Sequence, residues 1–572
     1  MSPLTLAILL LLLGSIWTFI HILCSSSSRS RPPGPRALPI IGNLHMLGSL
    51  PHRALQTLAK KYGPIMSLRL GHVPTIVVST PQAAELFLKT HDTIFASRPK
   101  LLASEYMSYG TKGMAFTEYG PYWRNVRKLC TLQLLSASKI ELFAPMRKQE
   151  LGSLVQSLKK AAARHEVVDL SAKVGQLIEE TTCRMLFGRS MDDRFDLKPL
   201  IVEVLRLSGA FNLADYVPYL GILDLQGLTR RMKKVSRALD VVFENIIEEH
   251  EQIPNGQQDR QRDFIDVLLS LMNQPMNPQD EQEYIIDRTN IKAIIVDMIT
   301  GAYDTSTSAI EWTFFELLRH PRRLRPRLNK IFGAFDKIFN TIIEEHEQQT
   351  PSKQGRHRDF VDMLLSLMNQ PMNISDEQET TLDRVKIKAI LLDMFTGASD
   401  TSIGTIDWTL MVEETDLGNL TYLDIVIKES FRLHPVAPLI IPRESMEDIE
   451  INGYYIPKKT RILVNAWAIG HNPDMWSKNA EEFYPERFIN SKVELKGRDF
   501  QLISFGLGRR GCPGMQLGLI KVKYAVAQLM HCFGWELPNG MSPNDLDMQE
   551  KNGLSMPRAN PLLVIPTYRL LS

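Results

Sequence analysis

Apolar and polar positions along this chain follow two different spacings. From Pro39 to about Leu86, short apolar-rich runs such as 65–70 and 75–79 are typical of β-strands. Farther on, apolar residues recur at helical spacing, and we predict helices over 153–160, 174–187 and 235–251. A second strand-like patch follows at 449–464. Because helices dominate and regular βα alternation is missing, the pattern predicts a mainly α fold of the α+β type.

The first 24 residues are the most apolar part of the chain. The stretch from Leu4 to Leu23 has no acid, lysine or arginine, and a membrane-spanning helix needs about 20 such residues. Positive charge begins at Arg29, which places the remainder in the cytosol by the positive-inside rule. A cleaved signal peptide is the alternative, but no positive charge precedes the long apolar run. We therefore predict a single-pass anchor at 1–24, a Ser/Arg/Pro-rich hinge at 25–38 and a folded body at 39–572.

Composition limits the class of protein, its partners and its compartment. The 572 residues are 44% hydrophobic and 23% charged, which is typical of a globular protein with a large core. The net charge of +2 gives no general attraction to nucleic acid. Five scattered cysteines do not form a disulfide framework, and they favour a reducing compartment.

The middle of the chain is duplicated. Residues 238–304 recur at an offset of 96, so that the segment 263–277 returns almost unchanged at 359–373. Repeat proteins need three or more units to bury their faces. Two copies inside one globular body therefore indicate a tandem duplication or a faulty gene model.

One short stretch carries the strongest chemical signal. Residues 505–514 place Cys512 among glycines and arginines, just before an apolar, helix-like run at 515–533. Unpaired N–H groups and the helix dipole at a helix start favour a thiolate, and a thiolate on a rigid turn can bind haem iron axially. Two other interpretations are a dinucleotide-binding turn, because Gly506–Gly511 reads G-x-G-x-x-G, and an ordinary buried thiol.

This stretch resembles the cysteine loop of the cytochrome P-450 family, which reads Phe-x-x-Gly-x-Arg-x-Cys-x-Gly. The common proline before the phenylalanine is Ser504 in this chain. Every fixed position of the motif is matched, by Phe505, Gly508, Arg510, Cys512 and Gly514.

Each copy of the repeat ends in a sequence that resembles the family's oxygen-handling motif, Ala/Gly-Gly-x-Asp/Glu-Thr. Small residues would open the helix for dioxygen, and the threonine hydroxyl could donate to a backbone carbonyl one turn back and bend the helix. The hydroxyl and the acid would then pass protons to bound oxygen. Copy one, with Asp304 and Thr305, is followed by the next helix that the resemblance implies, whereas copy two, with Asp400 and Thr401, skips it. We therefore predict that Asp304 and Thr305 act and that about 330–410 is an insertion, with Asp400 and Thr401 as the alternative.

Further motifs follow in the order of the family. By resemblance, Glu429-x-x-Arg432 and Arg487, in Pro-Glu-Arg-Phe, lock the core on the cysteine side, and a buried glutamate between two guanidiniums is chemically sensible. Trp123 and Arg127 are four residues apart and share a helix face. The resemblance gives them, with Arg443 and Arg510, contacts to the haem propionates.

The resemblance extends from the proline hinge to the C-terminus and identifies the chain as a member of the microsomal, plant-type branch. It implies a haem-dependent monooxygenase that hydroxylates or otherwise oxidises a small apolar metabolite with dioxygen. The cofactor would be haem b with Cys512 as the iron ligand, and the electrons would come from NADPH through a separate flavoprotein reductase. It also implies an endoplasmic reticulum membrane protein with a cytosolic haem-thiolate catalytic domain at 39–572. The reductase would dock on a basic patch, for which a solvated face is the alternative; the patch comprises Arg124, Lys128, Arg509, Lys521 and Lys523.

Two other functions stay open at this stage. The first is a haem enzyme that uses no dioxygen, like the isomerase or dehydratase members of the family. The other is a non-catalytic membrane protein that the duplication has disabled, because two near-identical helices compete for one place in the fold.

Overall fold

The computed structural model describes residues 30–190, 197–252, 262–276, 284–320, 412–477, 479–495 and 499–569, together with 5, 9 and 12–17. Most of the predicted anchor at 1–24 and all of the predicted insertion at about 330–410 lie outside these residues. Across the described positions, no helix combines the length and the apolar character that crossing a membrane requires.

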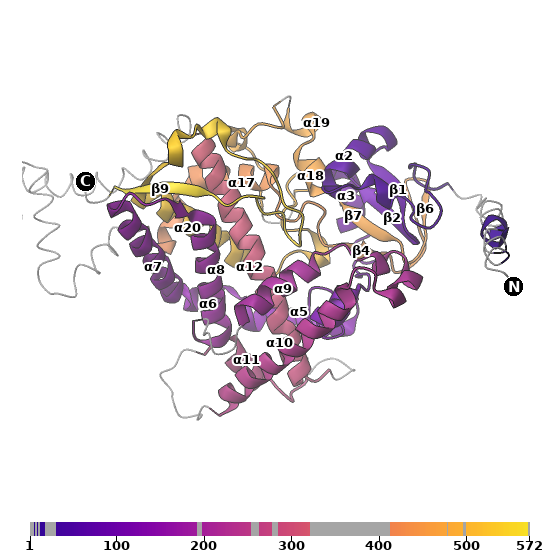
Figure 1. Ribbon diagram of the computed structural model, residues 1–572, viewed down its shortest axis with the longest axis horizontal. Coiled ribbons are helices and arrows are strands. Elements are labelled where there is room, and N and C mark those ends of the chain that lie inside the picture. Colours follow the sequence, from indigo (N-terminus) through magenta and orange to yellow (C-terminus); the bar gives the residue numbers. More distant parts are fainter. Residues whose placement is uncertain are drawn as a thin grey trace, which may run out of the picture.

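Helices fill most of the protein and surround one long central helix, α12, while small sheets lie to either side (Figure 1). The helices are α2 (Pro51–Tyr62), α3 (Pro81–Glu85), α4 (Leu102–Met107), α5 (Pro121–Leu129), α6 (Ala137–Leu142), α7 (Ala144–Ala163), α8 (Leu170–Phe187), α9 (Leu197–Ser208), α10 (Leu228–Glu251), α11 (Phe264–Ser270), α12 (Arg288–Arg319), α17 (Thr421–Leu433), α18 (Ala466–Gly470), α19 (Pro473–Trp476) and α20 (Met515–Cys532). The predicted mainly α plan with small sheets is confirmed.

The strands are β1 (Ile65–Leu70), β2 (Val73–Val78), β3 (Val168–Asp169), β4 (Arg443–Glu444), β5 (Ile449–Ile451), β6 (Tyr454–Ile456), β7 (Arg461–Val464), β8 (Phe533–Glu536) and β9 (Leu563–Tyr568). One sheet has the order β1-β2-β7-β4, in which β2 and β7 are parallel. It therefore joins the predicted early strands to the predicted patch at 449–464. A second sheet has the order β3-β9-β8, and β5 and β6 form a hairpin.

The central helix α12 explains how distant segments meet. It begins at a capping box, in which the Asp287 side chain accepts from the Asn290 N–H at 2.8 Å. Its first half packs into one apolar core with helices α8 to α11, and its second half packs into another with α17 and α20. A helix that is apolar on all sides is buried on all sides. The polar positions 301–308 therefore lie between two packed regions, in the middle of the molecule.

Candidate functional site

A tight loop leads into α20 and presents Cys512 just before that helix begins. Gly506 and Gly508 take the left-handed backbone region, with φ of 64° and 68°, which glycine adopts without strain. The Cys512 N–H donates to the Phe505 carbonyl at 2.9 Å and closes the loop. The residues before it, 499–505, form turns and extended chain with no sheet pairing. Because a dinucleotide-binding turn must follow a strand, the structure contradicts that alternative.

The Cys512 thiol is accessible to solvent and yet desolvated. Its side chain is exposed, but desolvation raises the pKa of the thiol, against smaller lowering contributions from the Gly514 backbone and the Arg127 guanidinium. Exposure and desolvation occur together when a thiol lines a recess and not the outer surface. The predicted contributions that favour a thiolate are present, but in the protein alone burial outweighs them.

Four guanidiniums converge beside the cysteine loop, those of Arg98, Arg127, Arg443 and Arg510. Desolvation, followed by the neighbouring guanidiniums, lowers the pKa of Arg98 and brings that of Arg510 to about 9. Among the described residues, the only ion pair of this cluster joins Arg443 to Asp92, at 2.6 Å. Buried cations in excess of anions are costly. The arrangement therefore fits a ligand that carries two carboxylates, as haem does.

Asp92 connects this arginine cluster to the cysteine loop. Its carboxylate accepts from the Arg443 guanidinium and, at 2.9 Å, from the Arg509 N–H. A Cβ at Gly508 would lie 2.5 Å from the Asp92 carboxylate and 2.4 Å from the Leu88 carbonyl oxygen, so only glycine fits there. Neither Asp92 nor Arg98 was predicted from the sequence, because no motif distinguishes either residue from a surface charge.

Trp123 and Arg127 share one face of α5, as their spacing predicts. The Arg127 guanidinium lies 5.5 Å from the centre of the Trp123 ring, and the Arg510 guanidinium lies 4.0 Å from it. The indole N–H donates to the Met114 carbonyl at 3.0 Å. In this structure Trp123 therefore stacks against the arginine cluster, and its N–H is used inside the protein.

The predicted oxygen-handling residues lie in the middle of α12. The Thr305 hydroxyl donates to the Gly301 carbonyl at 2.7 Å, which is the predicted bond to the preceding turn. Gly301 is exposed, and apart from its own helix backbone no atom lies within 4 Å of the place where its Cβ would be. The Asp304 carboxylate accepts from the Ser555 hydroxyl, a contact that the sequence did not predict. The alternative pair, Asp400 and Thr401, lies outside the described residues.

The three residues predicted to lock the core meet as a buried cluster. Both oxygens of the Glu429 carboxylate accept from Arg432 at 2.8 Å, and Oε1 also accepts from Arg487 Nε at 3.0 Å. The side chains of Glu429 and Arg432 are fully buried. The same helix, α17, is tied to the cysteine loop, because the Ser504 hydroxyl donates to the Phe431 carbonyl at 3.0 Å.

The predicted basic patch is partly wrong. Arg124, Lys128 and Arg509 are exposed. Lys521 is 6% exposed, its ammonium donates to Thr182 at 3.1 Å, and desolvation lowers its pKa to about 7. Lys523 forms an ion pair with an aspartate on α17. Helix α20 is buried on most sides, so a lysine on it does not have to reach the surface.

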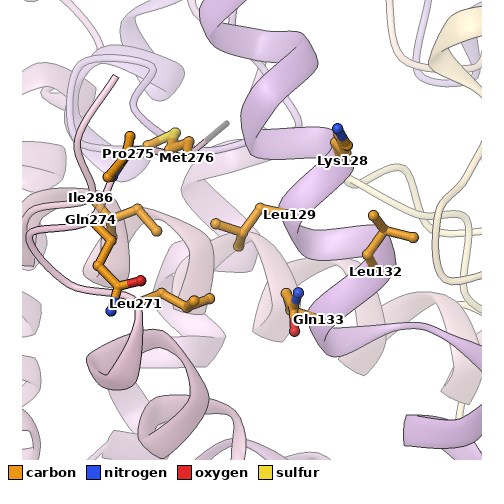
Figure 2. A pocket seen from close by; sticks show the side chains of 9 residues that line it. All are labelled: Lys128, Leu129, Leu132, Gln133, Leu271, Gln274, Pro275, Met276 and Ile286. Atoms are coloured by element: carbon orange, nitrogen blue, oxygen red, sulfur yellow. The ribbon is translucent and has the colours of Figure 1, made fainter. Parts of the chain in front are cut away.

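A surface hollow lies elsewhere, between the end of α5 and the segment after α11. Figure 2 shows its lining, which is mostly apolar; the residues are Lys128, Leu129, Leu132, Gln133, Leu271, Gln274, Pro275, Met276 and Ile286. It contains none of the residues predicted to bind haem or to handle oxygen, although Lys128 of the predicted basic patch lines it, and the cysteine loop does not contribute to it. The hollow is therefore separate from the candidate site, which remains at the cysteine loop and α12.

The chain matches known proteins along its whole length. The profile of the family "Cytochrome P450" matches residues 32–326, 322–412 and 411–565. A protein of Panax ginseng, cytochrome P450 CYP736A12, is 52% identical over 573 residues and 100% of both chains. The chain belongs to the cytochrome P450 family. It is a plant P450 monooxygenase, and its cofactor is haem b.

Other relatives of this P450 are more distant. Cytochrome P450 71A1 of Persea americana is 37% identical over 92% of each chain, and costunolide synthase of Cichorium intybus is 34% identical over 99% of this chain and 98% of that one. A solved structure of a zebrafish cytochrome P450 with abiraterone has a TM-score of 0.63 and 22% identity, and it covers 91% of this chain and 100% of that one. This structural likeness establishes the P450 fold alone.

Proposed function

We propose that this P450 inserts oxygen into a small apolar metabolite, with electrons that a separate flavoprotein reductase draws from NADPH. The observation that carries the proposal is the cluster of four guanidiniums, three of them buried and that of Arg127 partly buried, beside an accessible cysteine. Haem, when bound, supplies the iron at which dioxygen is activated. Cys512 would hold that iron, and the arginine cluster would hold the two carboxylates of the cofactor.

The residues on α12 manage space and protons. The bond from Thr305 to the Gly301 carbonyl holds its hydroxyl on the helix surface, and Gly301 leaves the adjacent space open. Asp304, next in sequence, is the acid that exchanges protons with this hydroxyl and with water. The Glu429, Arg432 and Arg487 cluster has a structural role, since it fixes α17 against residues 470–487. Helix α17 is in turn bonded to Ser504, at the start of the cysteine loop.

We propose further that the first copy of the duplication forms the working helix. In support, Glu316, on the helix that continues this copy, accepts from the buried His434 at 2.7 Å, and the residue 96 positions later is Val412, whose side chain cannot accept. Ser308 lies 3.4 Å from the Ser555 hydroxyl, and its counterpart is Gly404. Deleting residues 330–410 should then preserve the yield of haem-loaded protein, and complete loss of haem binding would contradict this assignment.

Surface features support attachment to the endoplasmic reticulum membrane through the segment at 1–24. Apolar side chains are exposed on the chain between α9 and α10, where Ile222 is 90% exposed. This region lies beside the N-terminal chain, because Tyr216 accepts from the His72 N–H at 2.8 Å and Ile41 accepts from the Gly71 N–H at 3.1 Å. Exposed apolar residues beside the chain that follows the predicted anchor favour contact with a lipid surface.

A basic surface supports docking of the reductase. Arg124, Lys128 and Arg509 are exposed, and they lie on α5 and on the cysteine loop. An acidic flavoprotein domain would approach this face by charge complementarity, with a rate that falls as salt is added.

Reconstitution tests the proposed function directly. The full chain is placed in lipid vesicles with an NADPH-dependent plant reductase and offered a set of small apolar plant metabolites under isotopically labelled dioxygen. We expect one labelled oxygen atom in the product, and no product from Cys512→Ser. Oxygen that comes from water, or turnover without dioxygen, would overturn the proposal.

A further inference from the structure

We propose that Ser555 is a positioning residue that orients the Asp304 carboxylate for proton delivery. The inference rests on the proposed monooxygenase function and adds to it a residue from the C-terminal part of the chain. The Ser555 hydroxyl donates to Asp304 Oδ2 and is 1% exposed. The two residues are 251 positions apart in the sequence.

The direction of the hydrogen bonds is fixed by chemistry. An ionised carboxylate only accepts, so Ser555 must donate its proton to Asp304. The Ser555 oxygen is then left to accept from the Ser308 hydroxyl, which lies 3.4 Å away and is also buried. The result is a one-way chain of two hydroxyls that ends on the carboxylate. Such a chain fixes the orientation of the carboxylate.

The segment that carries Ser555 is held from several sides. The Met556 N–H donates to the Val436 carbonyl, and the Met556 carbonyl accepts from the Trp312 indole N–H, both at 2.9 Å. A Cβ at Gly209, after α9, would lie only 2.2 Å from the Leu554 nitrogen. Because its backbone cannot move freely, Ser555 sets the position of Asp304 rather than following it.

The proton balance shows what depends on this orientation. Monooxygenation uses dioxygen, two electrons and two protons, and it yields oxidised product and water. If the protons are delivered to the wrong place, dioxygen takes up the same two electrons and two protons and is released as hydrogen peroxide. A tethered carboxylate has one oxygen left for proton exchange, in one orientation. Loss of the tether should therefore divert electrons from product to peroxide.

The first test measures hydrogen peroxide released per NADPH oxidised by the full-length holoenzyme with reductase. We expect Ser555→Ala to raise this ratio several-fold and Ser555→Thr, which keeps a hydroxyl, to restore it. Thr313→Val is the matched control, because it removes a buried hydroxyl from α12, the helix that carries Asp304. That hydroxyl bonds Ser430 at 2.9 Å and does not bond Asp304. A wild-type ratio in Ser555→Ala, or no rescue by threonine, would overturn the inference.

A second measurement is independent of turnover. The thermal midpoint should fall by less in the double variant than the sum of its decreases in Ser555→Ala and Asp304→Asn. The reason is that the two single substitutions remove the same hydrogen bond. Additive midpoints would also overturn the inference. If Ser555→Ala does not accumulate with haem, Ser308→Ala shortens the chain by one hydroxyl and should raise the peroxide ratio by a smaller factor; an unchanged ratio would count against the chain.

The carbon monoxide spectrum of each reduced variant separates the two proposals. If the wild-type protein lacks a thiolate-type band, the proposed function itself fails. If the band is present in wild type and Ser555→Ala, and the peroxide ratio is the same in both, only the role of Ser555 is wrong.

Discussion

Lys521 offers a quantitative test of how α20 is packed behind the cysteine loop. Desolvation, with a contribution from the Arg147 guanidinium, lowers the pKa of this lysine from 10.5 to about 7. A tenfold change in proton affinity corresponds to about 1.4 kcal/mol, so the charged form costs the folded state roughly 5 kcal/mol. Lys521→Met keeps the length of the side chain and removes the charge.

The sign of the pH dependence follows from linkage. The folded pKa of Lys521 lies below the unfolded value, so the penalty is complete below about pH 7, where both states hold the proton. Between about pH 7 and 10.5 the unfolded state binds more protons, and the penalty decreases as pH rises. Lys521→Met should therefore exceed wild type in stability by roughly 5 kcal/mol at pH 6 and by little near pH 10.5.

Urea unfolding followed by tryptophan fluorescence at several pH values measures this difference. Loss of the bond to Thr182 shifts all values by about 1 kcal/mol and leaves the pH dependence unchanged. Lys523→Met, two residues away and paired with Asp424 on a less buried side of α20, is the matched control for loss of a lysine from this helix. A difference between wild type and Lys521→Met that stays constant with pH would refute the reasoning.

Three further substitutions test the frame of the site. Glu429→Gln leaves two buried guanidiniums without their anion and should cost about 3–5 kcal/mol in urea unfolding; a loss below 1 kcal/mol would be inconsistent with the buried cluster. Gly508→Ala should abolish haem incorporation, measured by absorbance, because its Cβ meets a carbonyl at 2.4 Å, whereas Gly518→Ala, with its nearest contact at 3.9 Å, should be tolerated. Equal haem content in both would contradict the close approach. Ser504→Ala removes the bond to the Phe431 carbonyl and should cost about 1 kcal/mol, seen as faster loss of the haem-thiolate spectrum on heating; an unchanged rate would mean that this bond does not hold the loop.

Contacts between residues that are a few positions apart in one helix were predictable from the sequence. Glu429 and Arg432 lie on one helix face, and the contact with Arg487 follows because buried charges must be paired. The bond from Thr305 to Gly301 was predictable for the same reason, since it lies within one helix turn. Local geometry and charge pairing therefore account for much of the candidate site.

Contacts between distant segments were not predictable in this way. Asp92, Arg98 and Ser555 reach the site from opposite ends of the chain, and nothing in their neighbouring residues indicates a partner. Lys521 was predicted at the surface because a lysine usually is, whereas packing on most sides of α20 buries it. Tertiary packing supplied the information that single-chain patterns lack.

The central claim is that Cys512 holds the iron of haem as a thiolate. The most direct test is the absorption spectrum of the full-length protein, reduced with dithionite and exposed to carbon monoxide. A strongly red-shifted Soret band, lost in Cys512→Ser, is the predicted result. A band at the position typical of histidine-ligated haem, or no haem band at all, would contradict it.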